Sequence, residues 1–279
     1  TGNEMLQALV KKSVQSPSSI DTYKQCPRKY YYQYIEKLPT VPSIHLVRGN
    51  IAHSVLEHFF DLDQQRLVVE NYRTEIQKEV QQLLMKFWKE AHPQLTGLRL
   101  NEDQKRFYFE ETMLMLLNWS NQFIGDMEQT GLPVNEAFAF LTPVREQKYY
   151  SEEWQVQGYV DAIYQRNGET HLIDYKTSSS LTLSNEQRLQ LGIYSFLYQQ
   201  THGQPPAKVG IFFLRQKLRL FPVDKELLED AQREIIEIHK RTQTEHLDDY
   251  PRKTGPLCKW STGQCDFFNT CKPFQNGKS

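Results

Sequence analysis

Three charged side chains lie on two segments that together are typical of a β-hairpin. Asp161 lies in the first segment, Asp174 and Lys176 lie in the second, and Asn167-Gly168 between them favours a tight turn. Asp174 and Lys176 are two positions apart, so they project from one face of their strand. Two carboxylates with a backbone carbonyl suit Mg²⁺ or Mn²⁺, and such an ion can acidify a water molecule and neutralise charge at phosphorus. The alternative is an exposed sheet face with a salt bridge, which contributes little stability.

Two further pairs of polar residues each share one face of a predicted helix, because their members are four positions apart. His53 follows Gly49 near the start of one helix, and Glu57 lies one turn later. A structural histidine with a surface partner is the simplest interpretation of that pair. Gln190 and Tyr194 lie on a later helix. Alone, they indicate ordinary surface or core positions.

All four cysteines lie near the ends of the chain, and they are Cys26, Cys258, Cys265 and Cys271. Four thiols are too few for a disulfide scaffold, so we expect a cytosolic protein. Pro27 ends the helix before Cys26, which places this thiol at a junction from which it could reach a distant loop. Four thiolates suit zinc or an iron–sulfur cluster, and their spacing does not choose between the two. Four unrelated thiols are the alternative.

Alternating and helical hydrophobic patterns predict the elements that must position these residues. Strands are predicted at 143–151, 154–165, 169–176, 208–215 and 217–223. Helices are predicted at 17–26, from 27 onward, at 50–62, 185–201 and 224–247, and throughout 66–130 except for a break at 92–97. One face of the second strand is predicted to hold Trp154, Val156, Val160, Ala162 and Tyr164. The fold class is therefore α/β with a mixed sheet, preceded by a large helical insertion and followed by a metal-like tail.

Composition excludes several classes of protein. The 279 residues include 15 Phe, 15 Tyr and 4 Trp, far too many aromatic side chains for a disordered chain. No stretch is long and apolar enough to predict a membrane span. The net charge of −1 conceals two basic ends, with seven Lys/Arg against three Asp/Glu in residues 1–50 and five against one in residues 250–279. A near-neutral total therefore does not exclude a nucleic-acid partner.

Several motifs, in this order along the chain, resemble those of the PD-(D/E)XK nuclease superfamily, and within it the RecB-like branch. They are Gly49-Asn50-Ile51-Ala52-His53, Gly158-Tyr159-Val160-Asp161, Ile173-Asp174-Tyr175-Lys176-Thr177 and Gln190-Leu191-Gly192-Ile193-Tyr194. The resemblance implies a restriction-endonuclease-like core with a central mixed β-sheet flanked by helices. It implies that the ligands of a catalytic Mg²⁺ or Mn²⁺ are His53, Asp161, Asp174 and the backbone carbonyl of Tyr175.

The resemblance also implies roles for four residues beyond those ligands. Lys176 would be the catalytic lysine, and Gln190 and Tyr194 would contact DNA or order the site. Glu146, on the preceding strand, is an extra acidic residue of the site or a surface salt-bridge partner.

Iron–sulfur members of this branch place one cysteine before the nuclease core and three after it. Similarity to the AddB nuclease domain and to the CRISPR spacer-acquisition nucleases therefore implies a [4Fe–4S] cluster on Cys26, Cys258, Cys265 and Cys271, with zinc as the alternative. The six residues between Cys258 and Cys265 depart from the usual two. The expected segments are N-terminal helices with the first cluster cysteine at 1–48, a first core helix at 49–63, a helical insertion at 64–132, the nuclease core at 133–249 and a cysteine-rich tail at 250–279.

The function implied by the resemblance is a metal-dependent deoxyribonuclease, specifically an exonuclease on single-stranded DNA or DNA ends. Its expected partners are DNA and a helicase or other repair or CRISPR proteins, with no membrane, and its expected location is the cytoplasm, at the nucleoid if the source is prokaryotic. A non-cleaving DNA-binding or structural subunit is the alternative, and the intact set of Asp161, Asp174 and Lys176 argues against it. A redox protein would leave that set unexplained.

Overall fold

A mixed five-stranded sheet lies at the centre of the protein. The computed structural model describes residue 4 and residues 13–275, so sequence predictions for the outermost residues of both ends lie outside it. The strands are ordered β1-β2-β3-β4-β5, with only the β3–β4 pair parallel. Their bounds are β1 Val144–Ser151, β2 Val156–Arg166, β3 Glu169–Lys176, β4 Lys208–Phe213 and β5 Leu218–Pro222. The predicted mixed sheet and α/β class are thus confirmed.

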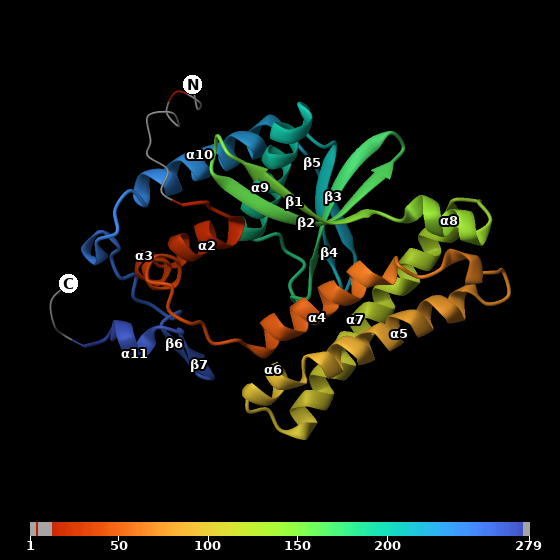
Figure 1. Ribbon diagram of the computed structural model, residues 1–279, viewed down its shortest axis with the longest axis horizontal. Coiled ribbons are helices and arrows are strands. Elements are labelled where there is room, and N and C mark those ends of the chain that lie inside the picture. The colour runs from red at the N-terminus through yellow and green to blue at the C-terminus, as the bar shows by residue number, and fades with distance from the viewer. Residues whose placement is uncertain (1–3, 5–12, 276–279) are drawn as a thin grey trace.

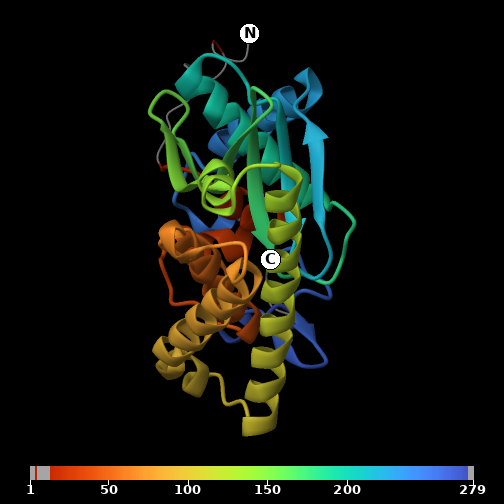
Figure 2. The ribbon, with the colours of Figure 1, turned by 90° about the vertical axis from the view of Figure 1, so that its right-hand side faces the viewer.

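Helices cover the sheet on both faces (Figures 1 and 2). On one face pack α9 (Asn185–His202) and α10 (Lys225–Arg241), whose apolar side chains form one core with those of the sheet. On the other face lies α4 (Ile44–Phe59), which shares a second core with the helices of the insertion. None of the helices in the described residues is long and apolar enough to cross a membrane.

The helical insertion is a long hairpin of helices packed against α4 (Figure 1). Its elements are the short 3₁₀ helix η2 Gln64–Arg66 and the α-helices α5 Tyr72–Glu90, α6 His92–Gly97 and α7 Glu102–Gln129, and the short helix α8 Val134–Leu141 follows it. The start of α7 is fixed by a capping box between Asn101 and Gln104. Phe59 of α4 is fully buried among the rings of Trp119, Phe123 and Phe138, so the insertion and α4 share one hydrophobic core.

The N-terminal helices and the C-terminal tail lie side by side, although they come from opposite ends of the sequence (Figure 1). The elements are α2 Pro17–Gln25, α3 Pro27–Tyr30 and the π-helix η1 Tyr31–Ile35, and in the tail η3 Leu247–Asp249, β6 Lys259–Trp260, β7 Gly263–Gln264 and α11 Phe268–Cys271. Arg28 Nε donates to the carbonyl of Tyr250 at 2.7 Å, and its backbone N–H donates to that of Pro251 at 3.3 Å. The ring of Tyr250 stacks on that of Tyr30.

Three sequence predictions about elements need correction, and one helix was not predicted. The first core helix begins at Ile44, because Ser43 caps it by accepting from the Leu46 N–H, so Gly49 lies inside the helix and not before it. Residues 92–97 form α6, since Pro93 is tolerated in a first helical turn. The helix α8 was not predicted, and α10 ends at Arg241 instead of reaching 247.

The single apolar face predicted for the second strand is also wrong. Val156 and Val160 pack in the core under α9, whereas Ala162 packs in the core under α4, together with its ladder partner Ile173. The change of core falls at Asp161, which accepts the Tyr175 N–H through its side chain and directly precedes the first residue of the regular β2–β3 ladder, Ala162.

Candidate active site

The candidate site lies where β2 and β3 separate. Beyond the Ala162–Ile173 pair the two strands no longer exchange backbone hydrogen bonds. In place of a carbonyl, the Asp161 carboxylate accepts the Tyr175 N–H, with 2.8 Å between Oδ2 and N. Asp161 and Asp174 are both buried, so the hairpin brings the two predicted carboxylates together away from solvent.

The helix α4 brings His53 to these carboxylates from the other side of the site. Its Nδ1 lies 2.7 Å from the Gly49 carbonyl oxygen, one turn earlier, and its Nε2 lies 3.0 Å from Asp161 Oδ2. A carbonyl and a carboxylate both accept hydrogen bonds, so these contacts together require a proton on each ring nitrogen. Burial by itself would lower the pKa of His53, but the hydrogen bond and charge of Asp161, with the charge of Asp174, raise it to about 9.

The pKa values of the two aspartates move apart. Burial raises the pKa of Asp174 to about 6, against the lowering effect of Lys176, whose Nζ lies 3.0 Å from Asp174 Oδ2. Burial also opposes ionisation of Asp161, but the hydrogen bond and charge of His53 hold its pKa below the usual value. The pKa of Lys176 is raised, because Asp174 outweighs the effect of burial. Asp174 and Lys176 are therefore a close charge pair, as their alternation on one strand face predicted.

Gln190 and Tyr194 come together on α9, as their spacing predicted, with Gln190 Nε2 donating to the Tyr194 hydroxyl at 2.8 Å. Burial raises the pKa of Tyr194 well above its ordinary value, and the charges of Asp174 and Asp161 add to this effect. The Tyr194 ring also packs against β2: a Cβ at Gly158 would lie only 2.9 Å from its Cε1. The tyrosine thus lies within the electrostatic reach of both aspartates.

Two glutamates extend the acidic side of the site. Burial raises the pKa of Glu146, on β1, to about 7, and the charges of Asp161 and Glu57 contribute. Glu146 also has a backbone φ of 48°, in the left-handed region that favours glycine. The sequence predicted Glu57 only as a surface partner of His53. The i+4 spacing of His53 and Glu57, which places both on one face of α4, was the signal that could have indicated its nearness to the site.

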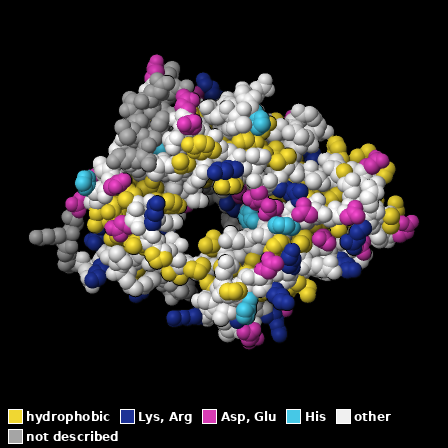
Figure 3. All heavy atoms as spheres, viewed as in Figure 1, with side chains coloured by type: hydrophobic (Ala, Val, Ile, Leu, Met, Phe, Trp, Pro, Cys, Tyr) yellow, Lys and Arg dark blue, Asp and Glu magenta, His cyan; other side chains and the backbone are white. Residues whose placement is uncertain are grey.

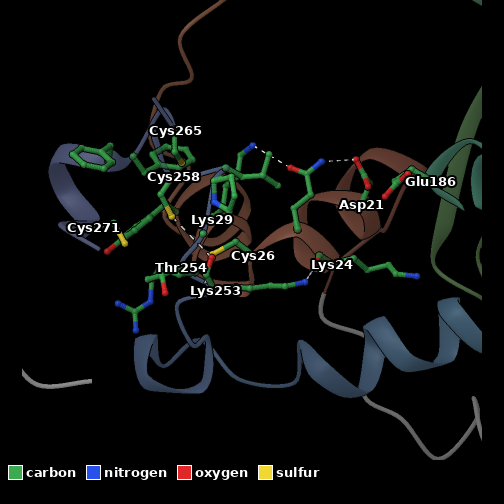
Figure 4. A pocket seen from close by; sticks show the side chains of 18 of the residues that line it. Asp21, Lys24, Cys26, Lys29, Glu186, Lys253, Thr254, Cys258, Cys265 and Cys271 are labelled. Atoms are coloured by element: carbon green, nitrogen blue, oxygen red, sulfur yellow. Dashed lines mark hydrogen bonds between the residues drawn. The ribbon is translucent and has the colours of Figure 1, made fainter. Parts of the chain in front are cut away.

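The four cysteines line one cavity of about 450 Å³ between the N-terminal helices and the tail (Figure 4). The backbone N–H of Lys253 lies 3.5 Å from Cys26 Sγ, and the N–H of Cys265 donates to the Cys258 carbonyl at 2.9 Å. Burial raises the thiol pKa of Cys265 and of Cys271. Cys258, the least regular by spacing, lies in the same cavity as the other three.

Among the described residues, no three His, Cys, Asp or Glu side chains are arranged so that they could hold one metal ion as they stand. At the aspartates the donor set still fits a hard cation, because two carboxylates and an imidazole offer oxygen and nitrogen ligands. The proton on His53 Nε2 would have to leave before that nitrogen could bind an ion. At the cysteines, four thiols on one cavity match the chemistry of zinc or an iron–sulfur cluster.

Comparison with known proteins decides the family. A sequence model of the PD-(D/E)XK nuclease superfamily matches residues 15–272, nearly the whole chain. This chain belongs to the PD-(D/E)XK nuclease superfamily. Its central sheet, with β2 and β3 bearing the aspartates and Lys176, is consistent with the restriction-endonuclease-like core of such nucleases.

Two phage proteins and one solved structure are similar to this superfamily member. The Gene 69 protein of Mycobacterium phage L5 is 24% identical over 94% of this chain and 97% of its own length. The Gene 69 protein of Mycobacterium phage D29 is 26% identical over 74% of this chain and 76% of its own. The crystal structure of a provisionally named exonuclease from Eubacterium rectale covers 96% of this chain and 91% of its own, with a TM-score of 0.54 and 11% identity, a likeness of fold.

Proposed function

We propose that this protein is a Mg²⁺- or Mn²⁺-dependent deoxyribonuclease that acts as an exonuclease on single-stranded DNA or on DNA ends. One observation carries the proposal: Asp161, Asp174 and Lys176 meet His53 at the point where β2 and β3 separate. Such a grouping of buried charges costs stability, because each carboxylate loses its hydration, and its presence therefore points to a functional site. Membership of a nuclease superfamily indicates phosphodiester hydrolysis as that use.

Each site residue would have a separate role in the cleavage of DNA. Asp161, Asp174, His53 and the backbone carbonyl of Tyr175 would hold the divalent ion, which when bound lowers the pKa of a water molecule and stabilises charge on the phosphoryl oxygens. Lys176, which Asp174 keeps protonated, would orient the attacking water or donate to the transition state. Gln190 and Tyr194 would fix the position of the DNA strand or of the neighbouring side chains.

An opening through the molecule supports action on a free strand. Figure 3 shows this opening near the centre of the face in view, with charged and histidine side chains gathered along one side. It lies below the sheet, between α2 and α3 on one side and α4, which carries His53, on the other (Figure 1). A single strand could pass through such an opening with its phosphates close to the site, whereas a strand without an end could not enter.

The four cysteines would hold a [4Fe–4S] cluster, with zinc as the alternative, and this cluster would join the two ends of the chain. The support for this is their common cavity, which Cys26 reaches from the junction of α2 and α3, Cys258 and Cys265 from either side of the β6–β7 pair, and Cys271 from α11 (Figure 4). A cluster there would stabilise the segment that closes the opening on one side. Helicases or other DNA-repair or CRISPR proteins are the protein partners that this combination favours.

A paired cleavage assay tests the nuclease proposal. The protein and its Asp174→Asn variant are incubated with end-labelled linear single-stranded DNA and Mg²⁺ or Mn²⁺. We expect the variant to lose about 10³-fold in rate, since a lost metal ligand removes several kcal/mol of transition-state stabilisation. Asp103→Asn, at the exposed start of α7, is the control and should cleave like the wild type. If the wild type leaves the DNA intact, the protein is a non-cleaving DNA-binding or structural subunit.

A further inference from the structure

One carboxylate of the helical insertion joins two arginines, one on α4 and one in the nuclease core. Glu111, on α7, accepts hydrogen bonds at Oε1 from Nη1 of Arg48 and from Nη2 of Arg215, the latter at 2.7 Å. Arg48 lies on α4, and Arg215 lies in the turn between β4 and β5. The three residues are far apart in sequence, so only the folded chain brings them together.

Each arginine leads directly to an element that carries a site residue. Arg215 Nε donates to the carbonyl of Thr177 at 3.0 Å, and the N–H of the preceding Leu214 donates to the carbonyl of Lys176 at 3.0 Å. The β4–β5 turn therefore holds the backbone of the catalytic lysine at the end of β3. Arg48 immediately precedes Gly49, whose carbonyl accepts from the His53 ring.

The insertion fixes the β4–β5 turn through further hydrogen bonds from α7. Asn118 Nδ2 donates to the carbonyls of Leu214 and Gln216 at 2.9 and 3.1 Å, and Gln122 Nε2 donates to the same Gln216 carbonyl at 2.7 Å. Asn118 and Glu111 are seven positions apart, which is two turns of helix, so they lie on one face of α7. That face of α7 therefore contacts the β4–β5 turn at several of its residues.

Burial makes the carboxylate necessary for this arrangement. The Arg48 side chain is 4% exposed and lies over the Tyr108 ring, whereas Glu111 is 23% exposed. Burial and the nearby charge of Arg215 both lower the pKa of Arg48, and Glu111 opposes them. Without a negative charge at position 111 the two guanidinium groups would repel each other at short range. The carboxylate thus holds α4 and the end of β3 in a fixed relation.

We propose that Glu111 is a positioning residue for the active site, which acts through Arg215 on the backbone of Lys176 and through Arg48 on the helix of His53. The kinetic part of this inference rests on the proposed nuclease function, and the structural part does not. The insertion therefore holds the end of β3 in place as well as covering the sheet. The set of hydrogen bonds that Glu111 accepts from Arg48 and Arg215 is called the brace below. The competing interpretation is that the two arginines bind DNA phosphates, and that Glu111 merely occupies the phosphate position when no DNA is bound.

Two variants test the proposal in different ways. Glu111→Gln keeps the size and an acceptor oxygen but removes the charge. Arg215→Lys keeps a charge for Glu111 but removes the planar fork that reaches both Glu111 and Thr177, and it leaves the buried Arg48–Glu111 pair intact. Glu102→Gln is the matched control, on the same helix with a side chain 90% exposed.

Hydrogen exchange of the metal-free, DNA-free protein reports on the brace directly. The informative amide is that of Leu214, which bonds to the Lys176 carbonyl. We expect it to exchange about tenfold faster in Glu111→Gln and in Arg215→Lys than in Glu102→Gln, because a loosened turn opens locally more often. Exchange rates equal to the control in both variants would overturn the proposal.

Steady-state cleavage of single-stranded DNA with Mn²⁺ separates positioning from binding. We expect kcat to fall about tenfold in both variants with KM unchanged, since small misplacements of a catalytic group cost rate. The double variant should be no slower than the slower single variant, because both changes break one connection. A raised KM at unchanged kcat would show phosphate binding instead, and a lowered melting temperature at unchanged kcat would show a structural role only. If the wild type does not cleave, the nuclease proposal fails and the exchange rates alone decide the brace.

Discussion

At the scale of single residues, the absence of one side chain shapes the site. Gly158 of β2 faces the Tyr194 ring so closely that a Cβ there would lie 2.9 Å from Cε1 and 3.5 Å from Leu197 Cδ1. Tyr194 is only 6% exposed, so its ring has little room to move away. The glycine therefore lets α9 approach the strand that carries Asp161.

Gly158→Ala should destabilise the protein by about 1–3 kcal/mol, because an added methyl group in a closely packed core forces neighbours to shift. It should also weaken the Gln190–Tyr194 hydrogen bond. Gly125→Ala is the control: Gly125 is inside α7 with nothing within 4 Å of its would-be Cβ, so the change should stabilise by about 0.5–1 kcal/mol. Urea unfolding measures the change in stability of each variant. Equal unfolding midpoints for Gly158→Ala and Gly125→Ala would show that the Tyr194 ring moves aside without cost.

The residues that meet at the site could be predicted only where their spacing along the chain decides the outcome. Alternation placed Asp174 and Lys176 on one face of β3, and their ion pair confirms it. The bond from Tyr175 N–H to Asp161 could not be predicted, because it depends on how far two strands separate. Arg215 and Glu111 gave no signal, since a contact between positions 104 apart leaves no local pattern.

At the scale of elements, one ring ties α4 to the insertion. Phe59 is fully buried, and its ring centroid lies 5.0 Å from that of Trp119 and 5.4 Å from that of Phe123. The edge-to-face arrangement adds to the burial of apolar area. Since α4 also carries His53, loss of this contact would loosen the helix that brings the histidine to the aspartates.

Phe59→Ala should lower the free energy of unfolding by about 3–5 kcal/mol, through lost burial and the cavity left among the rings. Phe140→Ala, which removes the same side chain from a position on α8 that is 57% exposed, is the matched control and should change it by less than about 1 kcal/mol. Urea unfolding followed by circular dichroism gives both values. A cost no larger than that of the control would mean that α4 and the insertion are not joined through Phe59.

The bounds of a helix or strand could be predicted from the sequence where a local signal marks its ends. β3 runs from Glu169 to Lys176, as the Asn167-Gly168 turn predicted, and α9 begins after Ser184, at the start of the helix predicted over 185–201. The start of α4 was missed because Ser43 is a helix cap six positions before a glycine that resembled a boundary. The short α8 was missed because its apolar run has no cap from a side chain.

At the scale of the whole molecule, the two ends of the chain meet at the cysteine cavity. Hydrogen bonds join them there: Lys253 Nζ donates to the Lys24 carbonyl at 3.1 Å, and Arg28 Nε donates to the carbonyl of Tyr250. The cysteine layout predicted that both ends would meet, and their common cavity agrees with it. The nature of the group that these cysteines would hold does not follow from spacing, because zinc and iron–sulfur clusters accept the same four thiolates.

If all four cysteines hold one cluster, each Cys→Ser variant purified without oxygen should lose the brown colour and the bound iron. Iron content and the visible spectrum measure this, and Thr270→Ser, next to Cys271 in α11, is the control that should keep both. Loss of the cluster should also make the tail more susceptible to limited proteolysis, because metal binding stabilises the fold that creates the site. Retention in Cys258→Ser alone would remove that residue from the ligand set. Colourless protein with one bound zinc would establish the alternative metal.

The opening in Figure 3 leads to a prediction about DNA topology. A linear single strand can thread its end into an opening that protein surrounds on all sides. A circle of the same sequence cannot pass through it unless the protein itself opens. We therefore expect circular single-stranded DNA to be cleaved at least about a hundredfold more slowly than the linear form, a difference of about 2.7 kcal/mol in activation free energy. The assay compares both forms with Mn²⁺, and the Asp174→Asn variant sets the background.

Linear DNA blocked at both ends by biotin–streptavidin is the second test, and it should resist cleavage like the circle. Equal rates on circles and linear strands would show that the strand reaches Asp161 and Asp174 from an open side, and the exonuclease proposal would then fail while the nuclease proposal stands.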